Sequence, residues 1–196
     1  MHRILFTCFE AAIAAVFLYP LILLLDKKQL HNRRLAIGYF LFSVYLSAMF
    51  AVAGLPNIRY IRFEPSINLK PFAYMFTDLT STLLNVVLFL PMGLFLPLLW
   101  RRFRKPLPTV LFGFCTSLLI ESLQIFTFRA TDINDLITNT LGTAIGWCAG
   151  RILLRLCKRI DPSGRTQDVY TVCIAALGVM FFLQPFLADW IRSILF

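Results

Sequence analysis

Polar side chains that could bind a ligand gather in the second half of a very apolar sequence. Glu121 and Gln124 stand three residues apart, and Asp135 and Asn139 stand four apart, so each pair shares one face of a helix. An ionisable group inside an apolar segment is costly unless it is paired or hydrated, and such groups commonly serve a function. Two chemistries follow: recognition of a polar ligand by hydrogen bonds, or proton transfer by a buried carboxylate.

A short polar stretch separates the two pairs and carries Arg129, Thr131 and Asp132. A guanidinium there can bind a phosphate with two parallel hydrogen bonds. The structural alternatives stay open: Thr131 or Asp132 as a helix cap, Asp135 in the first helical turn, and Arg129 paired with the carboxylates. For Glu121 and Gln124 the alternative is a hydrogen-bonded contact between helices.

The composition places these residues in a membrane protein. Hydrophobic residues make up 59% of the 196 residues and charged residues 15%, against about 45–50% and 25% in soluble domains. A small soluble domain could not bury that much apolar surface. The net charge of +9 falls in short clusters between apolar runs, which is typical of membrane topology. We therefore expect an all-α, polytopic transmembrane bundle and no nucleic-acid partner.

About six segments are long enough to cross a bilayer, and we expect them to form one membrane domain over residues 1–196. They are residues 4–25, 35–54, 82–100, 107–127, 134–156 and 169–194. The first is longer than the apolar part of a signal peptide, so we expect a retained helix. Most basic residues follow the first, third and fifth segments, which predicts that both termini lie outside.

The helical rise gives the depth of the polar residues. At about 1.5 Å per residue, Glu121, Asn139 and Asn85 lie ~9, ~8 and ~5 Å from the outer ends of their segments. Polar side chains with unrelated roles would lie at different depths in the bilayer, so we expect these three to line an outward-facing polar pocket. Its candidate ligand-binding residues are Asn85, Glu121, Gln124, Arg129, Asp132, Asp135 and Asn139.

Metal and cofactor sites are not expected. The five cysteines are odd in number and show no CxxC spacing, and the only histidines are His2 and His31. Glu10 lies at a depth comparable to that of Glu121, and we expect it to reach the outer interface.

Other features bear on packing. Gly142, Gly146 and Gly150 form two GxxxG steps, which predict close helix packing either within the chain or in a homo-oligomer. Pro91 and Pro97 predict a bend in the third segment. The outer loop, about residues 55–81, carries aromatic and aliphatic residues that suit the membrane interface. Its alternative role is a lid over the site.

The ordered set of motifs resembles the VanZ-like family. The matching pieces are residues 67–72, 85–93, 96–97, 120–124, 129, 132–135 and 139–142, which fall within a core of about residues 60–150. The family pattern falls on Asn85, Pro91, Gly93, Glu121, Gln124, Arg129, Asp132, Asp135, Asn139 and Gly142. The resemblance implies a multi-pass protein of the bacterial cytoplasmic membrane, associated with low-level resistance to the glycopeptide teicoplanin, and it implies no particular reaction.

Three functions compete. The leading one is binding of membrane lipids, with a polar lipid head group or cell-wall precursor as the ligand. The second is an enzyme acting on a lipid-linked substrate with Glu121 as acid or base, although no nucleophile–histidine pair, metal triad or phosphate loop supports it. The third is a proton-coupled transporter or flippase, which usually shows internal repeats that are absent here.

Overall fold

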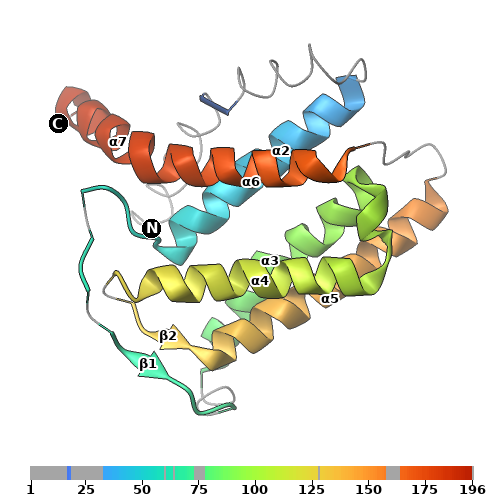
Figure 1. Ribbon diagram of the computed structural model, residues 1–196, viewed down its shortest axis with the longest axis horizontal. Coiled ribbons are helices and arrows are strands. Elements are labelled where there is room, and N and C mark those ends of the chain that lie inside the picture. Colours follow the sequence, from blue (N-terminus) through green and yellow to red (C-terminus); the bar gives the residue numbers. More distant parts are fainter. Residues whose placement is uncertain are drawn as a thin grey trace. The chain divides into compact units, whose positions relative to one another are not determined.

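The computed structural model describes residues 17–18, 33–59, 61–63, 65–72, 78–127, 129–157 and 164–195 (Figure 1). The predicted first span lies outside these residues except at 17–18, and Glu10 lies outside them too. Two compact units form, one from Met1–Arg62 with Gln167–Phe196 and the other from Phe63–Thr166. The single-domain prediction therefore stays a prediction.

The unit Phe63–Thr166 is built on three helices: α3 (Leu79–Leu99), α4 (Pro106–Gln124) and α5 (Ile133–Leu156). Each begins where the sequence provides a start signal. The carboxylate of Asp78 accepts a hydrogen bond from the Ser81 amide at 3.1 Å and caps α3. Pro106 begins α4, where its missing amide hydrogen costs nothing. A 3₁₀ turn, η1 (Arg101–Arg104), connects α3 to α4.

Helices α3 and α5 pack with their backbones in close contact, because glycines line the contact. A Cβ atom added to Gly142 would lie 2.3 Å from the Val86 carbonyl oxygen, and one on Gly146 would lie 2.0 Å from that of Leu90. The contacts advance in the same direction along both helices, so α3 and α5 run parallel. The face of α5 that holds Gly142, Gly146 and Gly150 thus packs within the chain, against α3. Homo-oligomerisation through these glycines stays untested, but α3 occupies the surface it would need.

Helix α3 continues through both of its prolines, Pro91 and Pro97, as one α-helical element. Between the two prolines, α3 packs closely against α5. A Cβ atom added to Gly93 would lie 2.0 Å from the Thr143 carbonyl oxygen of α5.

A small parallel sheet joins the loop before α3 to the turn between α4 and α5. Strand β1 (Ile67–Asn68) pairs with β2 (Thr131–Asp132), with Ile67 opposite Thr131 and Asn68 opposite Asp132. The Thr131 amide also donates to the Ser66 carbonyl at 2.8 Å. Two residues are too few to show strand alternation, so the sequence did not predict this pairing.

The other unit contains α2 (Arg33–Ala53), α6 (Thr166–Gly178), a π-helical segment η2 (Val179–Leu183) and α7 (Gln184–Leu195). The buried Tyr39 hydroxyl of α2 donates to the buried Asp168 carboxylate at the start of α6, at 2.8 Å. The predicted segment 169–194 is therefore divided into α6, η2 and α7.

Four of the described helices are long and apolar enough to cross a membrane: Arg34–Ala53, Leu79–Leu99, Pro106–Gln124 and Thr166–Phe186. The all-α membrane class predicted from the sequence is confirmed. Helix α5 has 24 residues but is not among the four, and it carries Asp135, Asn139, Arg151 and Arg155 along its length. The count of about six spans and the outside position of the termini stay predictions.

Candidate functional site

Glu121 is a buried carboxylate that holds the end of α4 to strand β2. Its side chain is only 4% exposed, and its Oε2 accepts a hydrogen bond from the Asp132 amide at 2.8 Å. The Thr131 hydroxyl also donates to the Glu121 carbonyl at 2.9 Å. Glu121 therefore helps to fix the turn that carries the other candidate residues.

Asp132 uses both of its carboxylate oxygens inside the protein. Its Oδ1 accepts from the Asn134 amide at 2.8 Å and from the Asn134 side chain at 2.9 Å. Its Oδ2 accepts from the Asn68 side chain at 3.0 Å. The sequence prediction that Asp132 can cap the following helix is confirmed, and Asp135 does lie in the first turn of α5.

Asp135 and Asn139 connect α5 to its two neighbours. The Asn85 amide group of α3 donates to Asp135 Oδ1 at 2.7 Å. The Asn139 amide group donates to the Ser117 hydroxyl of α4 at 2.9 Å. Ser117 lies one helical turn before Glu121 on α4. The buried Asn139 Oδ1 has no hydrogen-bond partner among the described residues.

Gln124 and Arg129 differ in exposure. Gln124 is buried at the end of α4, whereas Arg129 is exposed in the turn after it. The Arg129 amide donates to the Thr127 hydroxyl at 3.3 Å. The guanidinium lies close enough for its charge to act on both Glu121 and Asp135. Arg129 thus supplies a cation at the rim of the carboxylate-bearing end of the unit.

The seven predicted residues therefore lie at one end of the unit Phe63–Thr166, where α4 ends and α3 and α5 begin. We call this end the polar cluster; its members are Asn85, Glu121, Gln124, Arg129, Asp132, Asp135 and Asn139. It is rich in hydrogen-bond acceptors inside and has a cationic rim. Among the described residues, no group of three or more His, Cys, Asp or Glu side chains is arranged to hold a metal ion.

Sequence reasoning missed three residues that organise the polar cluster: Asn68, Ser117 and Asn134. Asn134 has the most contacts. Its Oδ1 accepts from the Phe72 amide at 2.6 Å, and its amide group donates more weakly to the Lys70 carbonyl at 3.4 Å. Phe72 has a positive φ of 62°, which is unfavourable for a residue with a Cβ atom. The position of Asn134, two residues after the capping Asp132, was the available signal.

Replacing Asn134 with alanine is expected to loosen the loop that contains β1. The variant loses the acceptor that holds the Phe72 amide, and a hydrogen bond of this kind contributes about 0.5–1.5 kcal/mol. Amide hydrogen exchange in residues 65–72 should accelerate by roughly a factor of three to ten. Thr140→Ala is the matched control, since the Thr140 hydroxyl donates to the Leu136 carbonyl of its own helix. Equal exchange in both variants would contradict this role.

Together, the apolar helices and the polar cluster define a helical membrane protein with acceptor-rich side chains gathered at one end of three packed helices. A model of the VanZ/LLP1 family matches residues 34–155, which is more than half of the chain. The chain belongs to the VanZ/LLP1 family.

One relative gives a more local comparison. Over 84 residues the chain is 39% identical to Protein VanZ from Enterococcus faecium, a stretch that covers 42% of this chain and 51% of that protein. The chain thus spans about half the length of this curated relative. No solved structure matches the chain.

Proposed function

We propose that this protein binds the polar head group of a lipid-linked molecule, of the kind used to build the cell wall, through an outward-facing site at the polar cluster. By its family, we further propose a role in resistance to the glycopeptide teicoplanin in the bacterial cytoplasmic membrane. The observation that carries the proposal is the convergence of polar side chains from α3, α4 and α5 at one end of an apolar bundle.

The acceptors in the polar cluster favour a ligand that carries hydroxyl or amide hydrogens. Asn139 Oδ1 has no partner among the described residues, and a buried acceptor without a partner costs about 1–3 kcal/mol. A sugar hydroxyl or a peptide amide would satisfy it. Glu121 and Asp135 each have a carboxylate oxygen besides the one in their hydrogen bonds to Asp132 and Asn85.

The rim favours an anionic group on the same ligand. Arg129 and Lys70 are exposed on the two segments that β1 and β2 join. The carboxylates do not oppose this arrangement strongly, because Asp132 is already bonded through both oxygens to Asn134 and Asn68. A phosphate at Arg129, with hydroxyl or amide groups reaching inward, matches both the rim and the interior.

The test is binding of a defined lipid to the purified full chain in detergent. The probe is the undecaprenyl-diphosphate-linked disaccharide peptide, with phosphatidylglycerol for comparison, and native mass spectrometry measures the bound fraction. Arg129→Ala is expected to weaken binding of the probe by roughly ten- to a hundredfold, since hydrogen bonds to charged groups contribute about 1.5–3 kcal/mol.

Arg102→Ala is the matched control, because it also removes one exposed arginine but lies in η1, before the start of α4. It should bind the probe as the wild type does. Equal binding of the probe by both variants, or no preference for the probe over phosphatidylglycerol, would refute the proposal.

A further inference from the structure

The helical stretch made of α6, η2 and α7 is longer than a membrane span requires. The apolar span Thr166–Phe186 has 21 residues, about 31 Å at the helical rise, which is enough for a hydrocarbon core of about 30 Å. Helix α7 runs on to Leu195. Its residues after Phe186 therefore need a place other than the hydrocarbon core.

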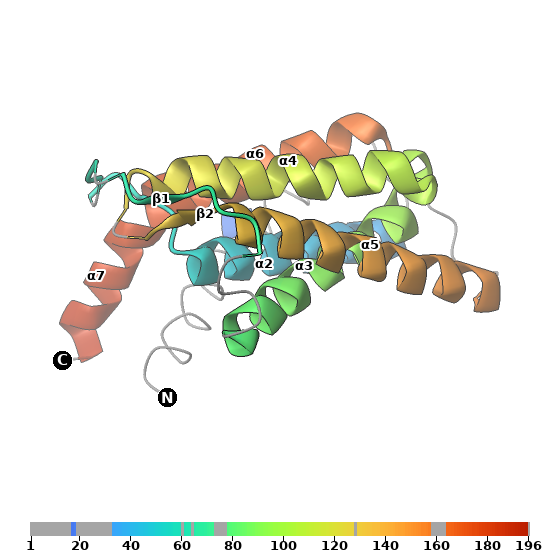
Figure 2. The same cartoon turned by 90° about the horizontal axis from the view of Figure 1, so that it is seen from below.

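The chain changes direction where α7 begins. The Gln184 amide bonds to the Val179 carbonyl, five residues back, which makes the π-helical turn. Pro185 follows, and proline has no amide hydrogen to give to the Phe181 carbonyl four residues back. That carbonyl accepts instead from the Ile58 amide at 3.2 Å, in the loop after α2. Figure 2 shows the axis of α7 turning away from that of α6.

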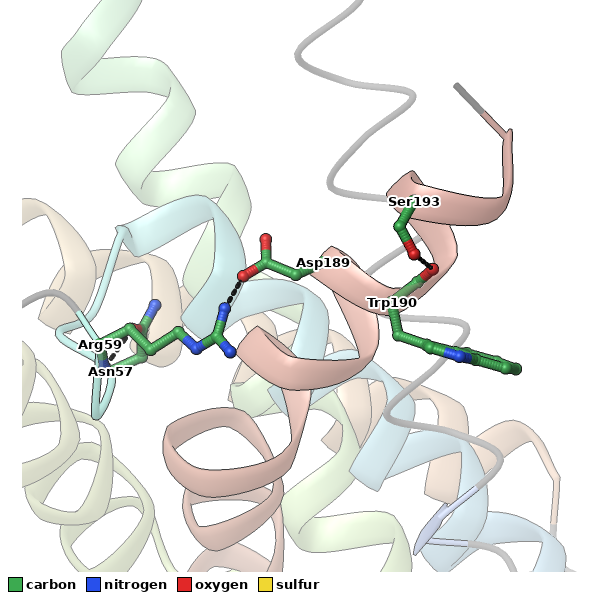
Figure 3. A network of polar contacts seen from close by, with 5 residues as sticks. All are labelled: Asn57, Arg59, Asp189, Trp190 and Ser193. Atoms are coloured by element: carbon green, nitrogen blue, oxygen red, sulfur yellow. Dashed lines mark hydrogen bonds and ion pairs between the residues drawn. The ribbon is translucent and has the colours of Figure 1, made fainter.

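A second contact from the same loop holds α7 at this angle. The Arg59 guanidinium forms an ion pair with the Asp189 carboxylate and lies over the Phe186 ring, 4.4 Å from its centre. The Arg59 amide donates to the Asn57 side chain at 3.1 Å, which shapes the loop (Figure 3). Two consecutive residues therefore hold the two sides of the turn: the Ile58 backbone binds η2, and the Arg59 side chain binds α7.

The sequence of α7 alternates polar and apolar residues with helical periodicity much more strongly than the sequences of the other described helices do. Phe186 and Trp190 stand one turn apart and are 48% and 62% exposed. Figure 3 shows the Trp190 ring pointing away from the ion pair of Arg59 and Asp189. Tryptophan is enriched at membrane–water interfaces, and a strongly amphipathic helix lies in the interface plane.

We infer that α7 lies in the membrane–water interface, with Phe186 and Trp190 inserted at the level of the lipid head groups and the ion pair of Arg59 and Asp189 facing water. The partner is the lipid bilayer itself. The span Thr166–Phe186 includes the first turn of α7, so the rest of α7 begins where the hydrocarbon core ends. This inference concerns residues other than those of the polar cluster and does not depend on the proposed function.

The depth of Trp190 tests the inference. The full chain is reconstituted in phosphatidylcholine vesicles whose acyl chains are brominated either at carbons 6 and 7 or at carbons 11 and 12. The quenchable fluorescence of Trp190 is the difference between the wild type and Trp190→Phe, which leaves Trp100 and Trp147 in place. We expect the shallow bromines to quench this difference signal at least twice as strongly as the deep ones.

Stronger quenching by the deep bromines would place Trp190 inside the hydrocarbon core and overturn the inference. Quenching by neither lipid would overturn it too, because Trp190 would then contact protein or water. Trp190 is exposed, so the phenylalanine variant should fold, and its elution as a single species on size exclusion verifies that.

Discussion

Replacing Gly146 with leucine is expected to prevent the unit Phe63–Thr166 from folding. Even the first carbon of the new side chain would lie 2.0 Å from the Leu90 carbonyl oxygen and 3.0 Å from the Leu94 amide nitrogen. Both atoms belong to the backbone of α3, so no rotamer change can relieve the clash. Overpacking of a core by small groups costs about 1–3 kcal/mol, and separating two helices costs more, because it also removes their shared contact surface.

Gly178→Ala is the matched control, since a Cβ atom there would meet nothing within 4 Å. Gly178 lies in α6, and alanine is favoured over glycine in a helix by about 1 kcal/mol. Thermal unfolding of the purified proteins in detergent should therefore show an unchanged or raised midpoint for Gly178→Ala. Gly146→Leu should yield little monodisperse protein. A Gly146→Leu protein that unfolds at the wild-type temperature would show that α3 and α5 do not pack as described.

The glycine contact illustrates how far the sequence alone reaches. Spacing of four residues predicted a close helix contact at Gly142, Gly146 and Gly150, and that contact exists. The partner was not predictable, because one helix face does not say which surface covers it. Gly93 on α3 contributes to the same contact from the other helix, against Thr143. A single glycine within a run of apolar residues does not by itself predict a close helix contact.

The sequence predicted the end of the helices at which the polar cluster lies. Depth arithmetic placed Asn85, Glu121 and Asn139 at the same end, and capping rules identified Asp132. The long-range partners were not predictable. The Asn68 side chain donates a hydrogen bond to Asp132, 64 residues away in the sequence, and Asn139 donates one to Ser117, 22 residues away. These choices depend on the rotation of each helix about its axis, which the packing of the glycines sets.

The sequence did not predict the turn between α6 and α7. The apolar run suggested one span over residues 169–194, since hydropathy does not register a change of direction. The turn arises from Pro185 and from the Ile58 amide that replaces the missing donor, a contact between segments more than 120 residues apart in the sequence.

Glu121→Gln is expected to separate ligand binding from folding. A glutamine oxygen can still accept the Asp132 amide hydrogen bond, so the turn between α4 and α5 should form and the unfolding midpoint should stay close to that of the wild type. The negative charge is lost, and with it the stronger hydrogen bonds that a carboxylate makes to hydroxyl and amide donors. Binding of the undecaprenyl-diphosphate-linked probe should weaken by about tenfold or more, which corresponds to about 1.4 kcal/mol.

Glu121→Ala should lose both properties. It removes the acceptor of the half-buried Asp132 amide, and leaving a buried donor unsatisfied costs up to about 1–3 kcal/mol. Ser122→Ala is the control on the same helix, because Ser122 is exposed and its hydroxyl donates to the Leu118 carbonyl of its own helix at 2.7 Å. It should match the wild type in both measurements. If Glu121→Gln binds the probe normally while Glu121→Ala only unfolds more easily, then Glu121 serves the fold and the ligand must be held by other members of the polar cluster.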